Sequence, residues 1–215
     1  GDEIMFASII REAHALCSKL IIQVDERLIP LFNRSFPDDI DFRIKSQHVS
    51  ENEYDFHLPM GSLPLRFRRN NEDFKSTSQG WLVGRNTRAT SLRKKLTRNA
   101  SEILIGISWQ STRPREGIEA KVISLAQLAK KLHGPKIKLV NLQYGEVSKE
   151  LDELRVKTKI NVVQLHEIDN KEDIDDLASL ILACDRIVSI SNLTIHLAGA
   201  LGKEADVLLP FSSDW

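Results

Sequence analysis

The order of apolar and polar positions divides the chain into a less regular first part and a regular second part. From Asn99 onward, short apolar, β-prone runs alternate with segments whose apolar residues recur at three- and four-residue spacing. Because strands that alternate with helices need crossovers between parallel neighbours, this pattern predicts a doubly wound α/β domain. We predict strands over residues 103–109, 137–142, 162–165, 186–190 and 207–209, and helices over 124–132, 147–157, 174–184 and 193–201.

The first part shows the same order of elements in a smaller and more irregular form. Apolar residues at helical spacing cover residues 4–20 and run into a buried strand over 20–24. A second helix ends before Pro37, and residues 41–44 alternate like a strand. The first part is therefore predicted to be a small Rossmann-like unit.

A basic stretch rich in proline and glycine lies between the two parts. Over residues 51–98 the periodicity weakens and arginine and lysine dominate, so we interpret the stretch as a solvated connector. The boundary is predicted within residues 91–101, which gives two domains, 1–98 and 99–215.

Composition and charge narrow the classes of function. The 215 residues carry 30 basic and 30 acidic side chains, so net charge gives no reason to expect nucleic acid or an anionic membrane as partner. The sequence contains neither an apolar run of membrane-spanning length nor a signal peptide, and we expect a cytoplasmic protein without a membrane span. Cys17 and Cys184 lie far apart in apolar helical patterns, so we expect two buried thiols.

Three loops after predicted strands carry candidate chemistry, because open parallel sheets bind ligands at the carboxyl ends of their strands. The loop after the first strand of the second part holds Ser108 and Trp109, with basic residues as far as Lys121, and its hydroxyl groups and cations suit a phosphate. The next loop holds Gln143 and Tyr144, which could bind a base or a sugar ring; a packing role for the tyrosine is the alternative.

The third loop carries the clearest pattern. Ser191, Asn192, Thr194 and His196 stand where a strand ends and a helix begins, and they can face an anion at the helix N-terminus. A structural role for His196 weighs about equally. At the start of the chain, Asp2 lies in the first turn of a helix, where a carboxylate is favoured by the helix dipole whatever the function.

Taken together, these segments follow the order seen in a known group of proteins. They are GDEIMFA at residues 1–7, RLIPLFNRSFP at 27–37, LPMGSLP at 58–64, GISW at 106–109, LQYG at 142–145, HLAGALG at 196–202 and LLPFSSDW at 208–215. The chain resembles the glycosyltransferase-like domain at the C-terminus of many bacterial tetratricopeptide-repeat proteins. That domain is similar to the ADP-heptose transferases of lipopolysaccharide synthesis, glycosyltransferase family 9.

The resemblance implies a GT-B-like fold, in which two Rossmann-like domains bind the acceptor and the nucleotide-sugar. It implies transfer of a sugar from a nucleotide-diphosphate sugar to an acceptor, with inversion and with neither a metal nor a cofactor. Asp2 matches the general base, and Lys121 matches a ligand of the donor diphosphate. The other expected donor-binding residues are Ser108, Trp109, Gln143, Tyr144, Ser191, Asn192, Thr194 and His196.

One departure from the family pattern keeps a second function open. The heptosyltransferases usually carry an aspartate five residues before the histidine of HLAGALG, and this chain has Ser191 there. The alternative is a non-catalytic module that binds a sugar nucleotide or a protein and is attached to a repeat scaffold. A nicotinamide-dependent enzyme is disfavoured, because neither part has Gly-x-Gly-x-x-Gly after its first strand.

The resemblance also implies that the chain is a fragment. In the family a strand precedes the Gly-Asp motif, and further helices follow the position of Trp215. We therefore expect an open position in the first sheet, where a second copy of the chain could pair to form a homodimer.

Overall fold

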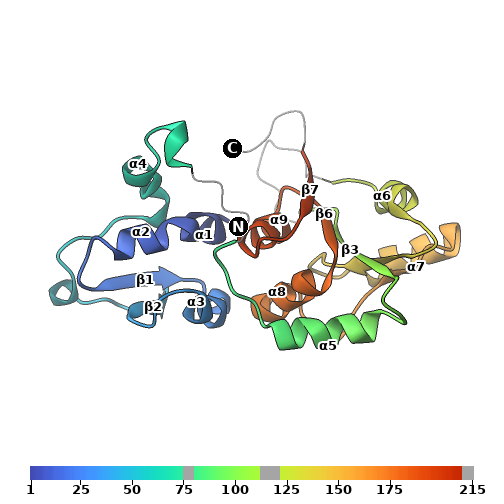
Figure 1. The fold of residues 1–215 in the computed structure, drawn as a ribbon, viewed down its shortest axis with the longest axis horizontal. Coiled ribbons are helices and arrows are strands. Elements are labelled where there is room, and N and C mark those ends of the chain that lie inside the picture. The colour runs from blue at the N-terminus through green and yellow to red at the C-terminus, as the bar shows by residue number, and fades with distance from the viewer. Residues whose placement is uncertain (75–79, 112–121, 210–215) are drawn as a thin grey trace.

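The structure is a computed structural model that describes residues 1–74, 80–111 and 122–209. Figure 1 shows two parts side by side, with the first sheet in blue and the second part in green to red. Lys121 and the segment 210–215 of the LLPFSSDW motif lie outside the described residues.

The second part contains a five-stranded parallel sheet with strand order β5-β4-β3-β6-β7. Its strands are β3 (Ile103–Ser108), β4 (Ile137–Asn141), β5 (Val162–Val163), β6 (Arg186–Ile190) and β7 (Ala205–Leu208). Its helices are α6 (Leu125–Leu132), α7 (Ser148–Thr158), α8 (Ile174–Ala183) and α9 (Leu193–Ala200). The expected α/β class is confirmed, and each predicted element of this part is present with ends shifted by at most two residues.

Helices cover both faces of this sheet because consecutive strand residues point to opposite sides. In β3, Leu104 packs in the hydrophobic cluster that contains α8 and α9, whereas Ile105 packs in the cluster that contains α6 and α7. The near-continuous apolar strands are typical of a parallel sheet buried on both faces.

The first part contains a two-stranded parallel sheet within the described residues. Its strands are β1 (Leu20–Val24) and β2 (Ile40–Ile44), paired from Leu20 opposite Ile40 to Val24 opposite Ile44. Both predicted strands are therefore confirmed, the second with one residue added. The helix α3 (Ile29–Ser35) lies between them in the chain, and the 3₁₀ turn η2 (Glu26–Leu28) precedes it.

The helix predicted over residues 4–20 is confirmed only as far as His14. Over this range the chain forms α1 (Asp2–Phe6), the 3₁₀ turn η1 (Ala7–Ile9) and α2 (Ile10–His14) in direct succession. The apolar spacing after His14 does not reflect burial, since Leu16 is 64% exposed. Cys17 is exposed as well, so the expectation of two buried thiols holds only for Cys184.

The basic stretch is more ordered than a solvated connector. It contains the 3₁₀ turns η3 (Glu51–Glu53), η4 (Met60–Ser62) and η5 (Asn71–Asp73) and the short helix α4 (Pro64–Phe67). It ends in the eleven-residue helix α5 (Asn86–Leu96).

Helix α5 packs along α8 of the second part (Figure 1). Its buried face consists of Ala89, Leu92 and Leu96. Its arginines bind carboxylates: Arg88 makes two hydrogen bonds to Asp176, at 3.0 and 2.8 Å. Apolar burial and charge pairing together hold this part of the basic stretch against the second sheet.

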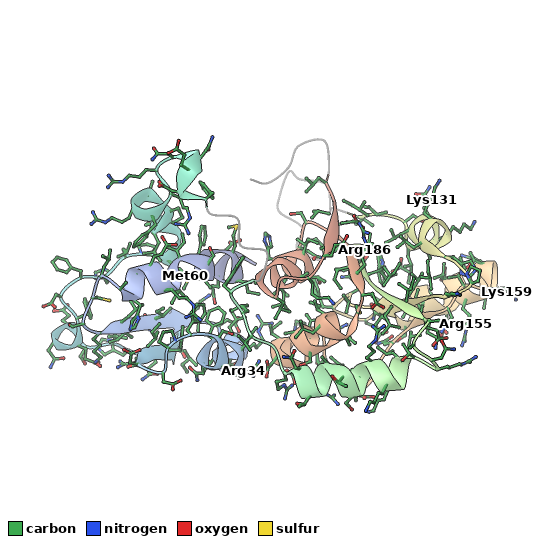
Figure 2. All side chains as sticks on the ribbon, viewed as in Figure 1. Arg34, Met60, Lys131, Arg155, Lys159 and Arg186 are labelled. Atoms are coloured by element: carbon green, nitrogen blue, oxygen red, sulfur yellow. The ribbon has the colours of Figure 1, made fainter. Side chains whose placement is uncertain are left out.

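The two parts share one hydrophobic cluster. It joins residues such as Ile4 and Phe32 of the first part to Leu177 and Leu197 of the second. At its edge Arg34 of α3 donates two hydrogen bonds to the carboxylate of Asp175 in α8 and a third, at 2.7 Å, to the carbonyl of Val83. Figure 2 shows Arg34 at this junction. In the described part of the chain, no helix has the length and apolar character needed to cross a membrane.

Candidate functional site

The carboxyl ends of β3 and β4 are joined through one buried side chain. Gln143, which is 1% exposed, accepts hydrogen bonds at its Oε1 from Ser108 Oγ at 2.9 Å and from the backbone N–H groups of Trp109 and Gln110 at 3.0 Å each. Three donors on one oxygen fix the path of the chain as it leaves β3.

Asn192 extends these bonds to β6 and α9. As the N-cap of α9, it accepts at Oδ1 from the N–H of Thr194 at 3.0 Å and from Ser189 Oγ at 3.1 Å, and it donates from Nδ2 to Ser108 Oγ at 2.7 Å. We call Ser108, Gln143, Ser189 and Asn192 the strand-end network. The structure thus brings together three of the predicted donor-binding residues, and their polar atoms bind one another.

Two further predicted residues are buried near this network. Trp109 is fully buried in the cluster under α6 and α7, and its indole N–H donates to Glu150 Oε2 at 3.0 Å. Thr194 is 1% exposed behind the N-cap of α9. In this conformation, both side chains are placed for packing.

Tyr144 and Gly145 form a turn at the end of β4. Tyr144 is half-buried. Gly145 has a φ of +87°, a conformation that favours glycine, and among the described residues no atom beyond its chain neighbours lies within 4 Å of where its Cβ would stand. Among the described residues, this end of the strand is therefore open beside Tyr144.

The N-terminus of the chain meets α9. A Cβ at Gly1 would stand 3.3 Å from Cδ2 of His196 and 3.8 Å from its Nε2, so the glycine allows close contact with the ring. Figure 1 shows the N-terminus and α1 beside α9. Asp2, which is exposed, and Ser191, which is half-exposed, lie at the starts of these two helices.

Gly1 therefore lies against His196 of α9, and the N-cap of the same helix, Asn192, belongs to the strand-end network. The backbone N–H of Thr194 donates to the side chain of the N-cap residue Asn192. The dipole of α9 still favours negative charge at the N-terminus of this helix. The N-terminus of α9 is therefore suited to an anion, and the exposed Asp2 directly follows Gly1 in the chain.

Two carboxylates near the ends of β4 and β5 stay ionised at neutral pH. The pKa of Glu146 is lowered because the hydroxyl and the backbone N–H of Ser148 hydrogen-bond to its carboxylate. The pKa of Asp169 is lowered by the backbone N–H groups of Glu172 and Lys171. Both carboxylates act as caps of local turns.

Asn170 was not among the predicted site residues. It lies between β5 and α8, and its Nδ2 donates to the backbone carbonyls of Asn141 at 3.3 Å and Gln143 at 3.2 Å. Its position after a strand of a parallel sheet is the signal that could have identified it.

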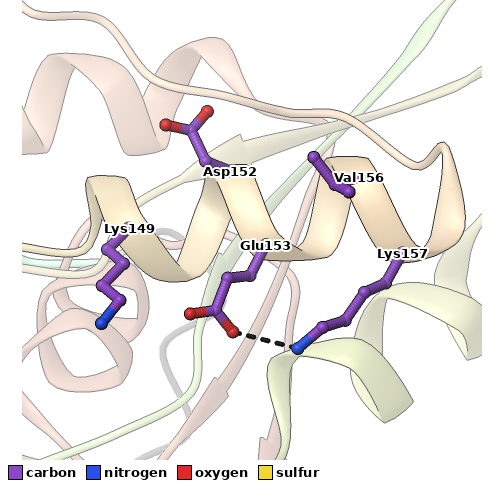
Figure 3. Close-up of a pocket in the computed structure, with 5 residues that line it drawn as sticks. All are labelled: Lys149, Asp152, Glu153, Val156 and Lys157. Atoms are coloured by element: carbon purple, nitrogen blue, oxygen red, sulfur yellow. Dashed lines mark hydrogen bonds and ion pairs between the residues drawn. The ribbon is translucent and has the colours of Figure 1, made fainter.

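Two surface grooves lie apart from these residues. One is formed by the outer face of α7 alone, where Glu153 and Lys157 make an ion pair of 3.1 Å (Figure 3). The other lies between α6 and the edge strand β7, with Val188 and Leu208 in its wall. Within residues 1–74, 80–111 and 122–209, no group of three or more His, Cys, Asp or Glu side chains is placed to hold a metal ion.

Comparison with known proteins gives one relative in sequence and one in structure, and no protein-family model matches the chain. Protein FlbA of Caulobacter vibrioides is 28% identical over 228 aligned residues, which include 99% of this chain. The chain spans 38% of the length of that relative.

The structural likeness is to a glycosyl transferase of family 9 from Veillonella parvula DSM 2008. The TM-score is 0.47 at 15% identity, with 60% of this chain and 36% of the other chain covered.

Proposed function

We propose that the chain binds a nucleotide-diphosphate sugar and transfers the sugar to an acceptor, without a metal and with inversion at the anomeric carbon. The observation that carries the proposal is the contact between Gly1 and His196, which places the start of the chain beside the N-terminus of α9. The motif resemblance indicates which substrate each side binds. In the similar transferases the Gly-Asp motif belongs to the acceptor side and the HLAGALG motif belongs to the donor side.

In the proposed site, the donor diphosphate lies in front of α9. His196, Ser191 and the dipole of α9 stabilise the negative charge that develops on the leaving nucleoside diphosphate. Lys121 contributes a cation to the same diphosphate. Tyr144 and Gly145 border the nucleoside.

The proposed reaction is one displacement. The acceptor hydroxyl attacks the anomeric carbon, the bond from that carbon to the diphosphate oxygen breaks, and Asp2 accepts the hydroxyl proton as general base. The strand-end network acts here by positioning: Gln143, Ser108 and Asn192 hold the loops that border the diphosphate. Thr194 and Trp109 support the same loops by packing.

Titration calorimetry with ADP-, GDP-, UDP- and dTDP-sugars tests the donor site. We expect one of them to bind, and His196→Ala to lower its affinity at least tenfold. His133→Ala, at an exposed position after α6, is the matched control and is expected to leave affinity unchanged. If none of the sugar nucleotides gives a measurable heat of binding, the proposed function is wrong.

Donor hydrolysis or transfer tests the base. Asp2→Asn is expected to lower the rate at least a hundredfold while leaving donor affinity unchanged, because the carboxylate acts only on the acceptor proton. Asp38→Asn, at another exposed position, is the control. An unchanged rate in Asp2→Asn would exclude Asp2 as the base.

A binding module without catalysis is the second candidate. It is favoured by the large apolar side chains that the first part exposes: Phe56 is 90%, Leu65 81% and Phe74 64% exposed. In this function the chain holds a protein partner or a sugar nucleotide beside a repeat scaffold. Binding of a sugar nucleotide with neither hydrolysis nor transfer would favour it.

Two proposals concern organisation. One is the division into domains 1–98 and 99–215, each of which contains one of the two sheets. This boundary lies after α5, which packs on α8 of the second domain. The other is a homodimer that forms at the open edge of the two-stranded sheet. Light scattering of the purified chain at several concentrations tests the dimer.

A further inference from the structure

The side-chain amide of Asn170 has a fixed orientation. Both groups that lie against its Nδ2 are backbone carbonyls, those of Asn141 and Gln143. A carbonyl only accepts, so the nitrogen must face them and Oδ1 must point away from these two carbonyls.

The oxygen of this amide is buried without a donor. Among the described residues, no hydrogen bond reaches Asn170 Oδ1. A buried acceptor that has lost water and gained no donor is costly, and such atoms are rare in folded proteins. A donor from outside the described chain is therefore expected at this atom.

The surroundings favour a ring system that carries an N–H group. Asn170 is bonded to Gln143, directly before the turn of Tyr144 and Gly145, which offers an aromatic side chain beside open space. The turn also lies at the carboxyl ends of the parallel strands, where open sheets bind ligands.

We propose that Asn170 determines base specificity, with Oδ1 accepting a hydrogen bond from an N–H group of the nucleobase of the donor. The inference rests on the proposed function, since it takes the ligand to be a nucleoside diphosphate. The base enters beside Gly145, and the two bonds from Nδ2 hold the acceptor in place before the ligand arrives.

The experiment measures the affinity of the full chain for ADP, GDP, UDP and dTDP by calorimetry. The tightest binder is then compared with its analogue in which every N–H group of the base is methylated: N6,N6-dimethyl-ADP, N1,N2,N2-trimethyl-GDP, N3-methyl-UDP or N3-methyl-dTDP. Methylation is expected to weaken binding about tenfold or more, because the buried acceptor is again left without a donor.

Substitution of the residue separates this hydrogen bond from steric effects of the methyl group. Asn170→Leu is expected to weaken binding of the parent nucleotide about tenfold and to bring the two affinities together. Asp169→Ala loosens the same loop, since its carboxylate accepts from the N–H groups of Lys171 and Glu172, and it is expected to retain the preference for the parent. If Asn170→Leu does not fold, Asn170→Ser, whose hydroxyl is too short to reach the base, takes its place.

The outcomes distinguish the two proposals. No binding of any diphosphate overturns the proposed function and this inference with it. Binding that is insensitive to methylation, or equally sensitive in Asn170→Leu, overturns the specificity role alone and leaves a water molecule as the partner of Oδ1.

Discussion

The hydrogen bonds of Asp25 illustrate how a single residue holds several elements of the first part together. Asp25 caps η2, and Arg27 donates from Nε and Nη2 to its two oxygens at 2.7 Å each. Its backbone N–H donates to Glu3 of α1 at 2.9 Å. One residue thus joins the end of β1 to α1 and to the start of α3.

This pairing predicts an acid-dependent loss of stability. The hydrogen bond from Arg27 is the main cause that lowers the pKa of Asp25 to about 2, from an ordinary value of 3.8. A depressed pKa stabilises the folded state above the unfolded pKa, and this stability is lost as pH falls through the folded pKa, here between about pH 4 and pH 2. The side chain is about one-third exposed, so screening limits the effect to on the order of 1 kcal/mol.

Asp25→Asn keeps a good cap and removes the charge. Urea unfolding from pH 2 to pH 7 is expected to show a difference in unfolding free energy between wild type and variant that is constant above about pH 5 and shrinks toward pH 2. Asp38→Asn, at an exposed position, serves as control. A difference independent of pH would contradict the role of the charge.

The two cysteines are predicted to differ in reactivity. Burial raises the pKa of the Cys184 thiol to about 12, whereas Cys17 is exposed after α2. Because the thiolate is the reactive form, a thiol reagent at pH 8 should label one cysteine in the native chain and two in denaturant. Cys17→Ser should abolish labelling of the native chain. In that variant Cys184 is the remaining cysteine, and its rapid labelling in the native state would contradict the burial of Cys184.

At the scale of elements, the strand-end network connects the three loops that follow β3, β4 and β6. Gln143→Leu leaves Ser108 Oγ and two backbone N–H groups without their acceptor, and we expect a loss of about 2–4 kcal/mol in unfolding free energy. Gln127→Leu makes the same change at an exposed position of α6 and should stay within about 0.5 kcal/mol. Chemical denaturation measures both, and equal losses would show that the network does not hold the loops.

Elements of the second part could be predicted because their patterns are local. The buried strand β6 and the helix α6 with its Ser124 cap follow from apolar runs and a capping residue. Helix α5 was missed because its arginines conceal an apolar face; the 3–4 spacing of Ala89, Leu92 and Leu96 was the available signal.

The candidate site was less predictable than the strands. Strand ends indicated Ser108, Gln143 and Asn192, but their mutual hydrogen bonds depend on contacts between residues up to 84 positions apart. The orphan oxygen of Asn170 depends on two carbonyls at the end of another strand, and no local pattern encodes it.

At the scale of the whole molecule, the two parts are joined by more than a connector. The shared hydrophobic cluster includes Phe32 of α3, which is fully buried, and helices α8 and α9 of the second part. Arg34 and Asp175 close its edge, with their side chains 29% and 11% exposed. Independent motion of the two parts would expose this apolar surface, so the parts are expected to behave as one cooperative unit.

Phe32→Ala tests this cooperativity. The cavity should lower unfolding free energy by about 3–5 kcal/mol, and hydrogen exchange should show the same loss of protection in β3 of the second part as in β1 of the first. Leu154→Ala, in the separate cluster under α7, should likewise lower protection in both sheets, because a cooperative unit loses stability as a whole. Loss confined to β1 in Phe32→Ala would instead mean that the first part unfolds alone, and the contact between Gly1 and His196 would then open without unfolding the second sheet.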